Sequence, residues 1–440
     1  MSTKIYPIGI QNFEKIRNDG YFYIDKTALM YQMVKTGSYY FLSRPRRFGK
    51  SLLISTLEAY FQGKKELFEG LAVEKLEKDW IKHPILHLDL NIEKYDTPES
   101  LDKILNDNLE YWESQYGTRP SETSFSLRFA GIIQRACEKT GQRVVILVDE
   151  YDKPMLQAIG NEELQKQFRN TLKPFYGALK TKDGYIKFAL LTGVTKFGKV
   201  SVFSDLNNLD DISMWNEYVE ICGVSEREIH ENLETELHEF AAARGITYDK
   251  LCEDLRECYD GYHFTHNSIG MYNPFSLLNA FKRKEFGSYW FETGTPTYLV
   301  KLLKKHHYDL ERMAHEETDV QVLNSIDSES TNPIPVIYQS GYLTIKGYDE
   351  EFGMYRLGFP NREVEEGFIR FLLPFYANVN KVESPFEIQK FVREVRSGDY
   401  NSFFHRLQSF FADTTYEVIR DQELHYENVL FIVFKLLGFY

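Results

Sequence analysis

Cysteine is scarce in this chain of 440 residues, which contains four. No two of them form a Cys-x-x-Cys pair, and none lies near a plausible set of histidine ligands. The pattern therefore favours neither a disulfide framework nor a zinc site. We expect a reducing, cytoplasmic compartment. The four residues are Cys137, Cys222, Cys252 and Cys258.

Long apolar segments are also missing. The first residues, Met1 to Pro7, contain no apolar stretch of the kind found in secretory signals. The longest apolar run, from Val429 to Tyr440, is interrupted by Lys435 and is much shorter than the ~20 residues that a membrane helix needs. The sequence thus predicts no membrane partner.

An excess of positive charge is absent too, because 52 Lys and Arg residues stand against 65 Asp and Glu, a net charge of −13. This balance excludes a general nucleic-acid binder, so any DNA contact requires a local basic patch. Aromatic residues, by contrast, make up 15% of the chain, which is too many for a disordered protein. We expect the whole length to fold, into about two or three domains.

Strand-like and helical patterns alternate through the first half of the chain. Apolar runs predict strands over 39–43, 85–90, 144–148 and 186–192, and helical spacing predicts helices over 51–61, 100–114, 124–139 and 162–180. Continuously apolar strands separated by helices are typical of a parallel sheet that is covered on both faces. We assign residues 1–222 to such an α/β domain.

The pattern changes at Ser225, where Ser225-Glu-Arg-Glu228 has the form of a capping box and opens a mainly helical region. Strand-like runs at 342–345 and 354–357 then read as a hairpin. Helices followed by a hairpin indicate a winged helix, so we assign residues 223–362 to a helical and winged-helix domain. Residues 363–440 are predicted to be an amphipathic helical tail.

The strongest chemical signal is Arg44-Pro-Arg-Arg-Phe-Gly-Lys-Ser51, between the first strand and the first long helix. Its spacing matches the phosphate-binding pattern GxxxxGK[ST], except that Arg44 replaces the first glycine. Gly49 permits the turn, Lys50 would neutralise phosphate oxygens, and Ser51 would bind Mg²⁺. The alternative is a solvated basic loop. We predict a nucleotide-binding segment made of Arg46, Arg47, Phe48, Gly49, Lys50, Ser51 and Leu52.

Two acids follow the apolar run from Val144 to Val148. Asp149 could hold Mg²⁺ at the end of the strand, and Glu150 could deprotonate the attacking water. Taken alone, the pair could equally mark the start of a loop. The order of phosphate loop and acidic strand favours the site, so we assign Asp149 to the metal, and Glu150 and Lys50 to catalysis.

Several other residues are open to more than one interpretation. Thr192, at the end of the next strand, either contacts the γ-phosphate as a catalytic sensor or caps the strand. Arg169 or Lys196 could stabilise charge during phosphoryl transfer, although such an arginine often comes from a neighbouring subunit, which makes a homo-oligomer possible. Tyr23 and Phe13 are candidates for stacking on adenine, but core roles are commoner for aromatic residues.

Three further histidine, acidic or basic features have more ordinary interpretations. His83 and His87 lack the context of a metal-binding helix and are expected to be structural or exposed. Asp89 is expected to start a loop. Lys304-Lys-His-His307 is expected to be a solvated helix face, and in a winged helix it could contact DNA phosphates, with a salt-dependent affinity.

Five motifs together resemble the predicted AAA-ATPase-like family of bacteria. They are Tyr23-Ile-Asp-Lys-Thr27, Phe41 to Leu52, Val148-Asp-Glu-Tyr-Asp-Lys-Pro154, Tyr259-Asp-Gly-Tyr262 and Asn273-Pro-Phe-Ser276. The resemblance spans nearly the whole chain and implies that Arg44 is the family's own form of the phosphate loop. It implies an ATPase that uses ATP and Mg²⁺.

The resemblance also implies a C-terminal PD-(D/E)XK nuclease-like domain. The segment from Tyr426 to Tyr440 is similar to its first helix, with Glu427 at the position of the helical glutamate. The strands that would carry the metal-binding acids do not follow, so we expect no nuclease activity and a truncated chain. The overall expectation is an ATPase that drives or gates a nucleic-acid-associated effector. The alternatives are a nucleotide sensor with little turnover and a winged-helix DNA-binding protein.

Overall fold

The computed structural model describes residues 4–196, 206, 208–292, 297–324, 326, 332–377, 384–412 and 422–438. Its centre is a five-stranded parallel sheet in the order β2-β3-β4-β1-β5. The strands are β1 Tyr39–Ser43, β2 Ile85–Asp89, β3 Val144–Asp149, β4 Ile186–Gly193 and β5 Asp210–Asp211.

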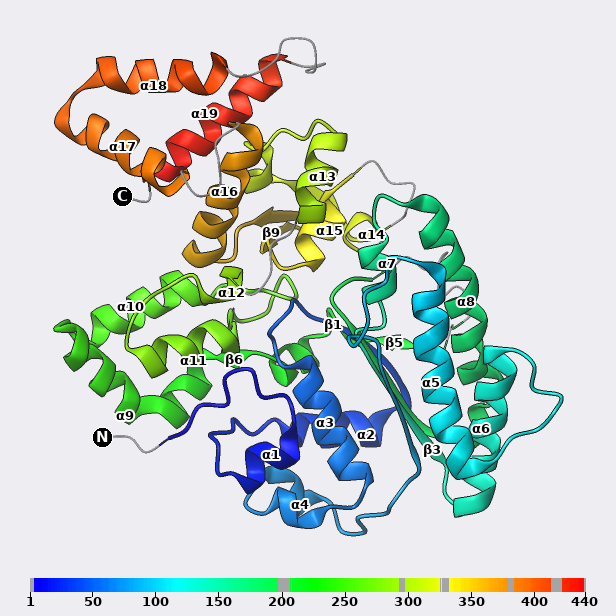
Figure 1. Ribbon diagram of the computed structural model, residues 1–440. Coiled ribbons are helices and arrows are strands. Elements are labelled where there is room, and N and C mark those ends of the chain that lie inside the picture. Colours follow the sequence, from blue (N-terminus) through cyan, green and yellow to red (C-terminus); the bar gives the residue numbers. More distant parts are fainter. Residues whose placement is uncertain are drawn as a thin grey trace.

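Helices cover both faces of this sheet (Figure 1). One layer contains α5 Pro98–Tyr116, α6 Phe125–Thr140 and α8 Glu162–Thr181, which pack against one another. The other contains α2 Thr27–Thr36 and α3 Lys50–Phe61, with α1 Phe13–Asn18 and α4 Ala72–Leu76 outside them. The predicted α/β architecture is confirmed, and it is the arrangement of a P-loop NTPase-like domain.

The strand order places the functional candidates at one edge. Residues Val144 to Val148 of β3 are at most 1% exposed, as expected for a strand covered on both faces. Strand β4 lies between β1 and β3, and Ser43 pairs with Gly193 while Asp89 pairs with Asp149. The carboxyl ends of β1, β4, β3 and β2 therefore meet along one edge of the sheet.

A second hydrophobic core lies in residues 224–289. Here β6 Val224–Ser225 pairs with β7 Met271–Tyr272, and the helices are α9 Glu226–Arg244, α10 Tyr248–Tyr259 and α11 Pro274–Arg283. The predicted capping box is present, because the Ser225 side chain accepts from the Glu228 N–H and Glu228 accepts from the Ser225 N–H. We call residues 223–292 the helical lobe.

The chain then returns to the main core, which continues from Trp290 to Leu436. The elements here are α12 Tyr289–Glu292, α13 Thr297–Lys305, α14 Val320–Leu323 and α15 Ile334–Gln339. The predicted hairpin forms between β9 Thr344–Asp349 and β10 Met354–Gly358. A third strand that the sequence did not indicate, β8 Glu317–Asp319, pairs with β10.

The tail is helical, as expected, and consists of α16 Arg362–Tyr376, α17 Ser384–Ser397, α18 Tyr400–Ala412 and α19 Gln422–Gly438. Helix α16 packs on α19, α10 and α12, so it joins the tail to the rest of the molecule (Figure 1). The remaining elements are α7 Lys153–Gln157 and the 3-10 turns η1 Lys65–Phe68, η2 Asp183–Tyr185, η3 Asn216–Ile221 and η4 Arg312–His315. Across the described ranges, no helix has both the length and the apolar character to cross a bilayer.

Candidate functional site

The loop from Arg44 to Ser51, called the 44–51 loop, connects β1 to α3 at the shared strand edge. Gly49 caps α3 with φ +99°, in the region that favours glycine, and a Cβ added there would meet no atom within 4 Å. Open space therefore faces Gly49 at the positive end of a 12-residue helix. This combination provides an anion cradle.

The Lys50 side chain lies inside this loop. Its Nζ atom donates to the carbonyl oxygens of Arg44 at 3.0 Å and Pro45 at 3.4 Å, and the side chain is nearly fully buried. The same Nζ atom lies 3.5 Å from Glu150 Oε1. The 44–51 loop and the acidic end of β3 therefore face each other directly, as the sequence predicted.

The two acids after β3 differ in their surroundings. Asp149 is 4% exposed, and its Oδ1 atom accepts from the Thr192 hydroxyl at 2.6 Å and from the Glu150 N–H at 3.1 Å. Glu150 is partly exposed and has φ +53°, which costs of order 1 kcal/mol in a residue other than glycine. Glu150 thus combines a strained backbone conformation with a carboxylate that faces Lys50.

Thr192 is fully buried at the end of β4, and its hydroxyl contacts the metal candidate Asp149. This contact fixes the orientation of the Asp149 carboxylate. Ser51, the other metal candidate, begins α3 beside Lys50. Within the part of the chain that the structure describes, no cluster of three His, Cys, Asp or Glu could hold a metal. A hydroxyl and a carboxylate together with phosphate oxygens nevertheless suit Mg²⁺, which is commonly bound through one or two carboxylates plus phosphates.

A third acid, Asp152, lies beside Glu150 and Lys50 and was not predicted from the sequence. Its buried carboxylate accepts from the Thr195 N–H and hydroxyl at 2.6 and 2.5 Å and from the Val194 N–H at 3.1 Å. Burial and the charge of Glu150 raise the pKa of Asp152 to about 7, against the Thr195 hydrogen bonds and Lys50. The only signal in the sequence is its place in Asp149-Glu-Tyr-Asp152, three residues after the first acid.

Arg46, Arg47 and Phe48 were predicted to bind the nucleotide, and in the structure their side chains contact aromatic rings of the second half of the chain. The Arg46 guanidinium lies 4.6 Å from the Trp290 ring, and that of Arg47 lies 4.9 Å from the Phe275 ring. Both guanidinium groups therefore lie against aromatic rings, and their part in nucleotide binding stays a prediction.

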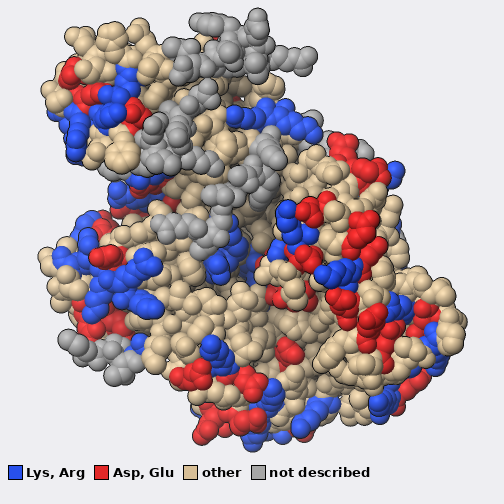
Figure 2. Space-filling model, viewed as in Figure 1, with Lys and Arg blue, Asp and Glu red and all other residues tan. Residues whose placement is uncertain are grey.

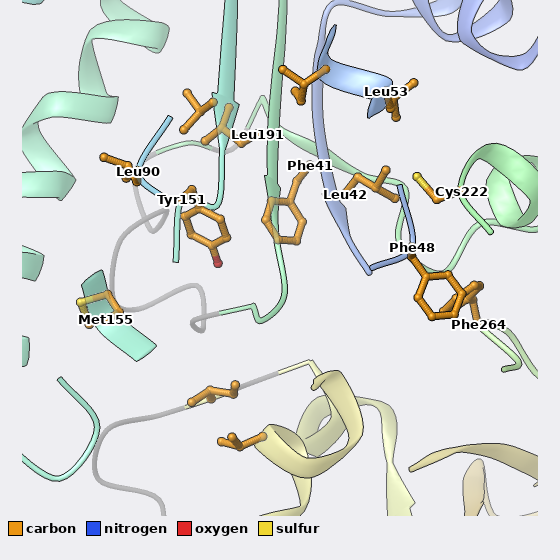
Figure 3. Close-up of a cluster of buried hydrophobic side chains, with 14 of the residues drawn as sticks. Phe41, Leu42, Phe48, Leu53, Leu90, Tyr151, Met155, Leu191, Cys222 and Phe264 are labelled. Carbon is orange, nitrogen blue, oxygen red and sulfur yellow. The ribbon is translucent and has the colours of Figure 1, made fainter. Parts of the chain in front are cut away.

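Phe48 packs edge-on against aromatic rings of the second half of the chain. Figure 3 shows the Phe48 and Phe264 rings side by side. Their centroids are 5.5 Å apart, and that of Phe48 lies 4.8 Å from that of Tyr262. The Phe48 side chain is 1% exposed and is therefore part of the hydrophobic core.

The Arg44 side chain also points toward the second half of the chain. Its guanidinium is 1% exposed, donates to the carbonyl oxygens of Ser213 at 2.7 Å and Tyr218 at 3.1 Å, and lies 3.9 Å from the Phe264 ring. Burial lowers the pKa of Arg44 to about 10. The residue in place of the first glycine is thus a buried structural cation.

A cavity of about 100 Å³ adjoins the 44–51 loop on the α3 side. Leu52 and Tyr23 line it, whereas Phe13 is fully buried and packs behind Tyr23 with ring centroids 5.3 Å apart. The wall is mainly apolar and includes Phe48, Gly49, Leu53, Thr56, Ile221, Cys222 and Gly223.

The other candidate residues lie away from the 44–51 loop or contact other parts of the chain. Lys196 forms an ion pair with Asp211 and donates to Asn324 Oδ1 at 3.3 Å, and Arg169 lies on α8. His83 Nδ1 lies 2.9 Å from the Arg143 carbonyl.

His87 contacts Glu58 at 3.1 Å, and Asp89 ends β2 and accepts from the Asn91 N–H at 2.7 Å, which is a loop start as expected. Lys304 is exposed on α13, and Glu427 lines a surface cavity with Glu365.

Comparison with known proteins agrees with this geometry. The family described as "Predicted AAA-ATPase" matches residues 7–203, which contain both the 44–51 loop and the acids after β3. A protein of Azotobacter chroococcum mcd 1, described as "Uncharacterized protein in vnfD 5'region", is 35% identical over 452 residues, covering 100% of this chain and 84% of the relative. The chain belongs to the family of predicted AAA-ATPases.

Proposed function

We propose that this protein binds Mg²⁺-ATP in the 44–51 loop and hydrolyses it. The observation that carries the proposal is the 3.5 Å approach of Lys50 Nζ to Glu150 Oε1, because it brings a phosphate-binding ammonium group and a candidate base to one point. Glu150 is partly exposed there, so water can reach it. Family membership supports an ATPase activity in general terms.

In this proposal the loop holds the phosphates, and the acids after β3 serve the metal and the attacking water. The Gly49 N–H and the Lys50 ammonium hold phosphate oxygens, and the N-terminus of α3 adds a favourable dipole. Ser51 and Asp149 hold Mg²⁺, which when bound neutralises charge on the phosphates. Glu150 takes a proton from the attacking water.

Thr192 orients the metal-binding acid rather than touching the γ-phosphate, since its hydroxyl is already 2.6 Å from Asp149 Oδ1. The cavity beside Tyr23 and Leu52 takes the base. Apolar walls of this kind are typical of nucleotide-base and other small-ligand sites.

A nucleotide-controlled switch with little turnover is the second candidate. The observation that favours it is the set of contacts from Arg44, Arg46 and Phe48 to residues from position 213 onward, which links the loop to the rest of the chain. In that case ATP would stabilise one arrangement of the chain. Tight binding of ATP without hydrolysis would favour this candidate.

The domain limits 1–222, 223–362 and 363–440 stay a proposal. The β9–β10 hairpin after α14 and α15 supports a winged helix in the middle unit. The separate core of residues 224–289, in contrast, groups the helical lobe apart from that hairpin. We propose a cytoplasmic protein whose middle unit transmits nucleotide state to a nucleic-acid-associated effector, with a possible homo-oligomer.

A nucleic-acid contact would require a basic patch, given the net charge. On the face seen in Figure 2, acidic and basic side chains are mixed over α5 and α8, and basic side chains gather on the side of α9 to α11. Lys282 and Arg283, in the last turn of α11, are exposed. Gel-shift titration at several salt concentrations tests this contact, and a salt-independent or absent shift would remove the nucleic-acid part of the proposal.

The enzymatic proposal is tested by ATP binding and turnover in the full chain and two variants. Lys50→Ala should weaken ATP binding on the order of 100-fold, because a charged phosphate ligand is lost. Glu150→Gln should keep ATP binding and lower turnover by roughly 10²- to 10⁴-fold. Lys304→Ala, which removes an exposed lysine outside the loop, is the control and should match wild type. Equal hydrolysis in all four proteins would contradict the proposal.

A further inference from the structure

The main-chain carbonyl of Arg46 is held from outside the sheet domain. Trp290 Nε1 donates to this oxygen at 3.0 Å, and Asn273 Nδ2 lies 3.4 Å from it in a second hydrogen bond. Both donors belong to the helical lobe, more than 220 residues away in sequence. The proposed function makes no use of either residue.

Both donors are rigidly placed. The Asn273 side chain caps α11, because its Oδ1 atom accepts from the N–H groups of Phe275 at 3.0 Å and Ser276 at 3.2 Å. The amide oxygen is thus occupied, and the amide nitrogen is the atom that faces the loop.

Trp290 is fully buried, and its main-chain N–H donates to Glu363 Oε1 at 2.7 Å. Its ring packs edge-on against Tyr342, with centroids 5.1 Å apart. The indole nitrogen is therefore presented to Arg46 by a side chain with little freedom to move.

The two donors also determine where the next N–H points. In a planar trans peptide, the carbonyl of one residue and the N–H of the next point in opposite directions. A carbonyl of Arg46 drawn toward the helical lobe therefore turns the N–H of Arg47 the opposite way. The same relation holds two residues later. The Gly223 N–H donates to the Phe48 carbonyl at 3.0 Å and so turns the Gly49 N–H the opposite way.

We infer that Trp290 and Asn273 are positioning residues of the 44–51 loop, which orient the Arg47 N–H toward a bound phosphate by holding the opposite end of the same peptide unit. This inference rests on the proposed function, because it needs a nucleotide in the loop. It assigns to the helical lobe a direct part in phosphate affinity. By linkage, a ligand of the helical lobe that shifts α11 or α12 changes ATP affinity, and ATP changes the affinity for that ligand equally.

Two variants remove one donor each while keeping a related side chain in its place. Trp290→Phe keeps an aromatic ring beneath Arg46 but lacks the indole N–H. Asn273→Ser keeps a good helix-capping oxygen but lacks the amide donor. Tyr342→Phe is the matched control, because its hydroxyl contacts the Arg46 guanidinium at 3.3 Å and leaves the carbonyl untouched.

The measurements are the dissociation constants of inorganic tripolyphosphate and ATP, the KM and kcat for ATP, and the melting temperature. Each donor variant should bind tripolyphosphate and ATP about tenfold more weakly, the effect of one hydrogen bond. The KM for ATP should rise while kcat at saturation stays within about twofold, because Glu150 is unchanged. Tyr342→Phe should bind as wild type does.

Wild-type affinity in Trp290→Phe and Asn273→Ser would overturn the inference, and so would an equal loss in Tyr342→Phe. A lower melting temperature with unchanged tripolyphosphate affinity would show a structural role alone and would also overturn it. If one variant does not fold, the other decides. Failure of the proposed function is distinguishable, because the wild-type protein would then bind neither ATP nor tripolyphosphate.

Discussion

The two ends of the 44–51 loop differ in what they contact. The side chains of Arg44, Arg46 and Phe48 contact carbonyl oxygens and aromatic rings of residues from position 213 onward. Gly49 faces open space, and Lys50 faces Glu150. The first end is therefore an anchor and the second a cradle. The identity of the residues at the first end of the loop is therefore explained by their packing contacts.

The anchor explains why glycine is absent from the first position of the loop. Pro45 lies so close to Gly341 that a Cβ at position 341 would lie 2.6 Å from the Pro45 Cβ. The loop thus enters a packed joint, and the Arg44 guanidinium supplies hydrogen bonds to main-chain carbonyls within it. Glycine at position 44 would leave those carbonyls without their donors.

The largest effect should come from Arg44→Gly, which restores the common motif but removes the anchor. It deletes hydrogen bonds from a charged group to Ser213 and Tyr218 and the contact with Phe264, so it should lower the free energy of unfolding by about 3 kcal/mol. Urea denaturation measures the change. Arg47→Gly, at an exposed residue with φ +67°, is the control and should be close to neutral. A stable Arg44→Gly protein would remove the distinction between anchor and cradle.

Ser51→Ala should show the opposite behaviour, because it changes the cradle alone. Unfolding should be unaffected, whereas ATP affinity in the presence of Mg²⁺ should fall about tenfold through loss of a metal ligand. With EDTA present, the variant and wild type should bind ATP equally. Titration calorimetry under both conditions makes the measurement, and an equal loss in EDTA would mean that Ser51 does not act through the metal.

Thr192→Val tests the support of the cradle. The variant removes a buried hydroxyl that donates to Asp149 Oδ1 at 2.6 Å, so it should destabilise the fold by about 1 to 2 kcal/mol. It should also lower the affinity for Mg²⁺-ATP more than that for ATP alone, because the metal-binding acid loses its orientation. Thr192→Ser keeps the hydroxyl and should retain both properties. If the valine and serine variants behave alike, the contact has no such role.

The smallest effect should be the change in stability between pH 6 and 8 that comes from Asp152. Its pKa is raised to about 7 by burial and Glu150, so the folded protein holds a proton that the unfolded chain has already released. Stability should therefore fall as pH rises from about 4 to 7 and then level off, with about 1 kcal/mol lost between pH 6 and 8. Asp152→Asn should lack this slope. Melting temperatures of both proteins across this range decide, and parallel curves would contradict the assignment.

The sequence predicted the parts of the fold that arise from local pattern. Apolar runs such as Val144 to Val148 gave the strands, and Ser225 with Glu228 gave a helix start, because both depend on neighbouring residues. Strand β5 has only two residues, Asp210 and Asp211, and could not be recognised from any pattern. The position of β4 between β1 and β3 is a matter of tertiary pairing, which the alternation of strands and helices does not specify.

The site was predictable to the same extent. Lys50 and Glu150 followed from motif and order, and the structure brings them within 3.5 Å. The directions of the Arg46 and Arg47 side chains were not predictable, because their aromatic partners Trp290 and Phe275 lie far along the chain. A basic residue in such a loop suggests a phosphate ligand, whereas its ring contacts become visible only in the packing, and its role in nucleotide binding stays a prediction.

The central claim is that ATP phosphates lie in the cradle, and a crystal structure of the full chain with Mg²⁺ and a non-hydrolysable ATP analogue tests it most directly. The account predicts phosphate oxygens at the Gly49 N–H and Lys50 Nζ, with Mg²⁺ between Ser51 and Asp149 and Glu150 beside the γ-phosphate. An analogue bound elsewhere, or a cradle still filled by the Lys50–Glu150 pair at saturating analogue, would contradict it.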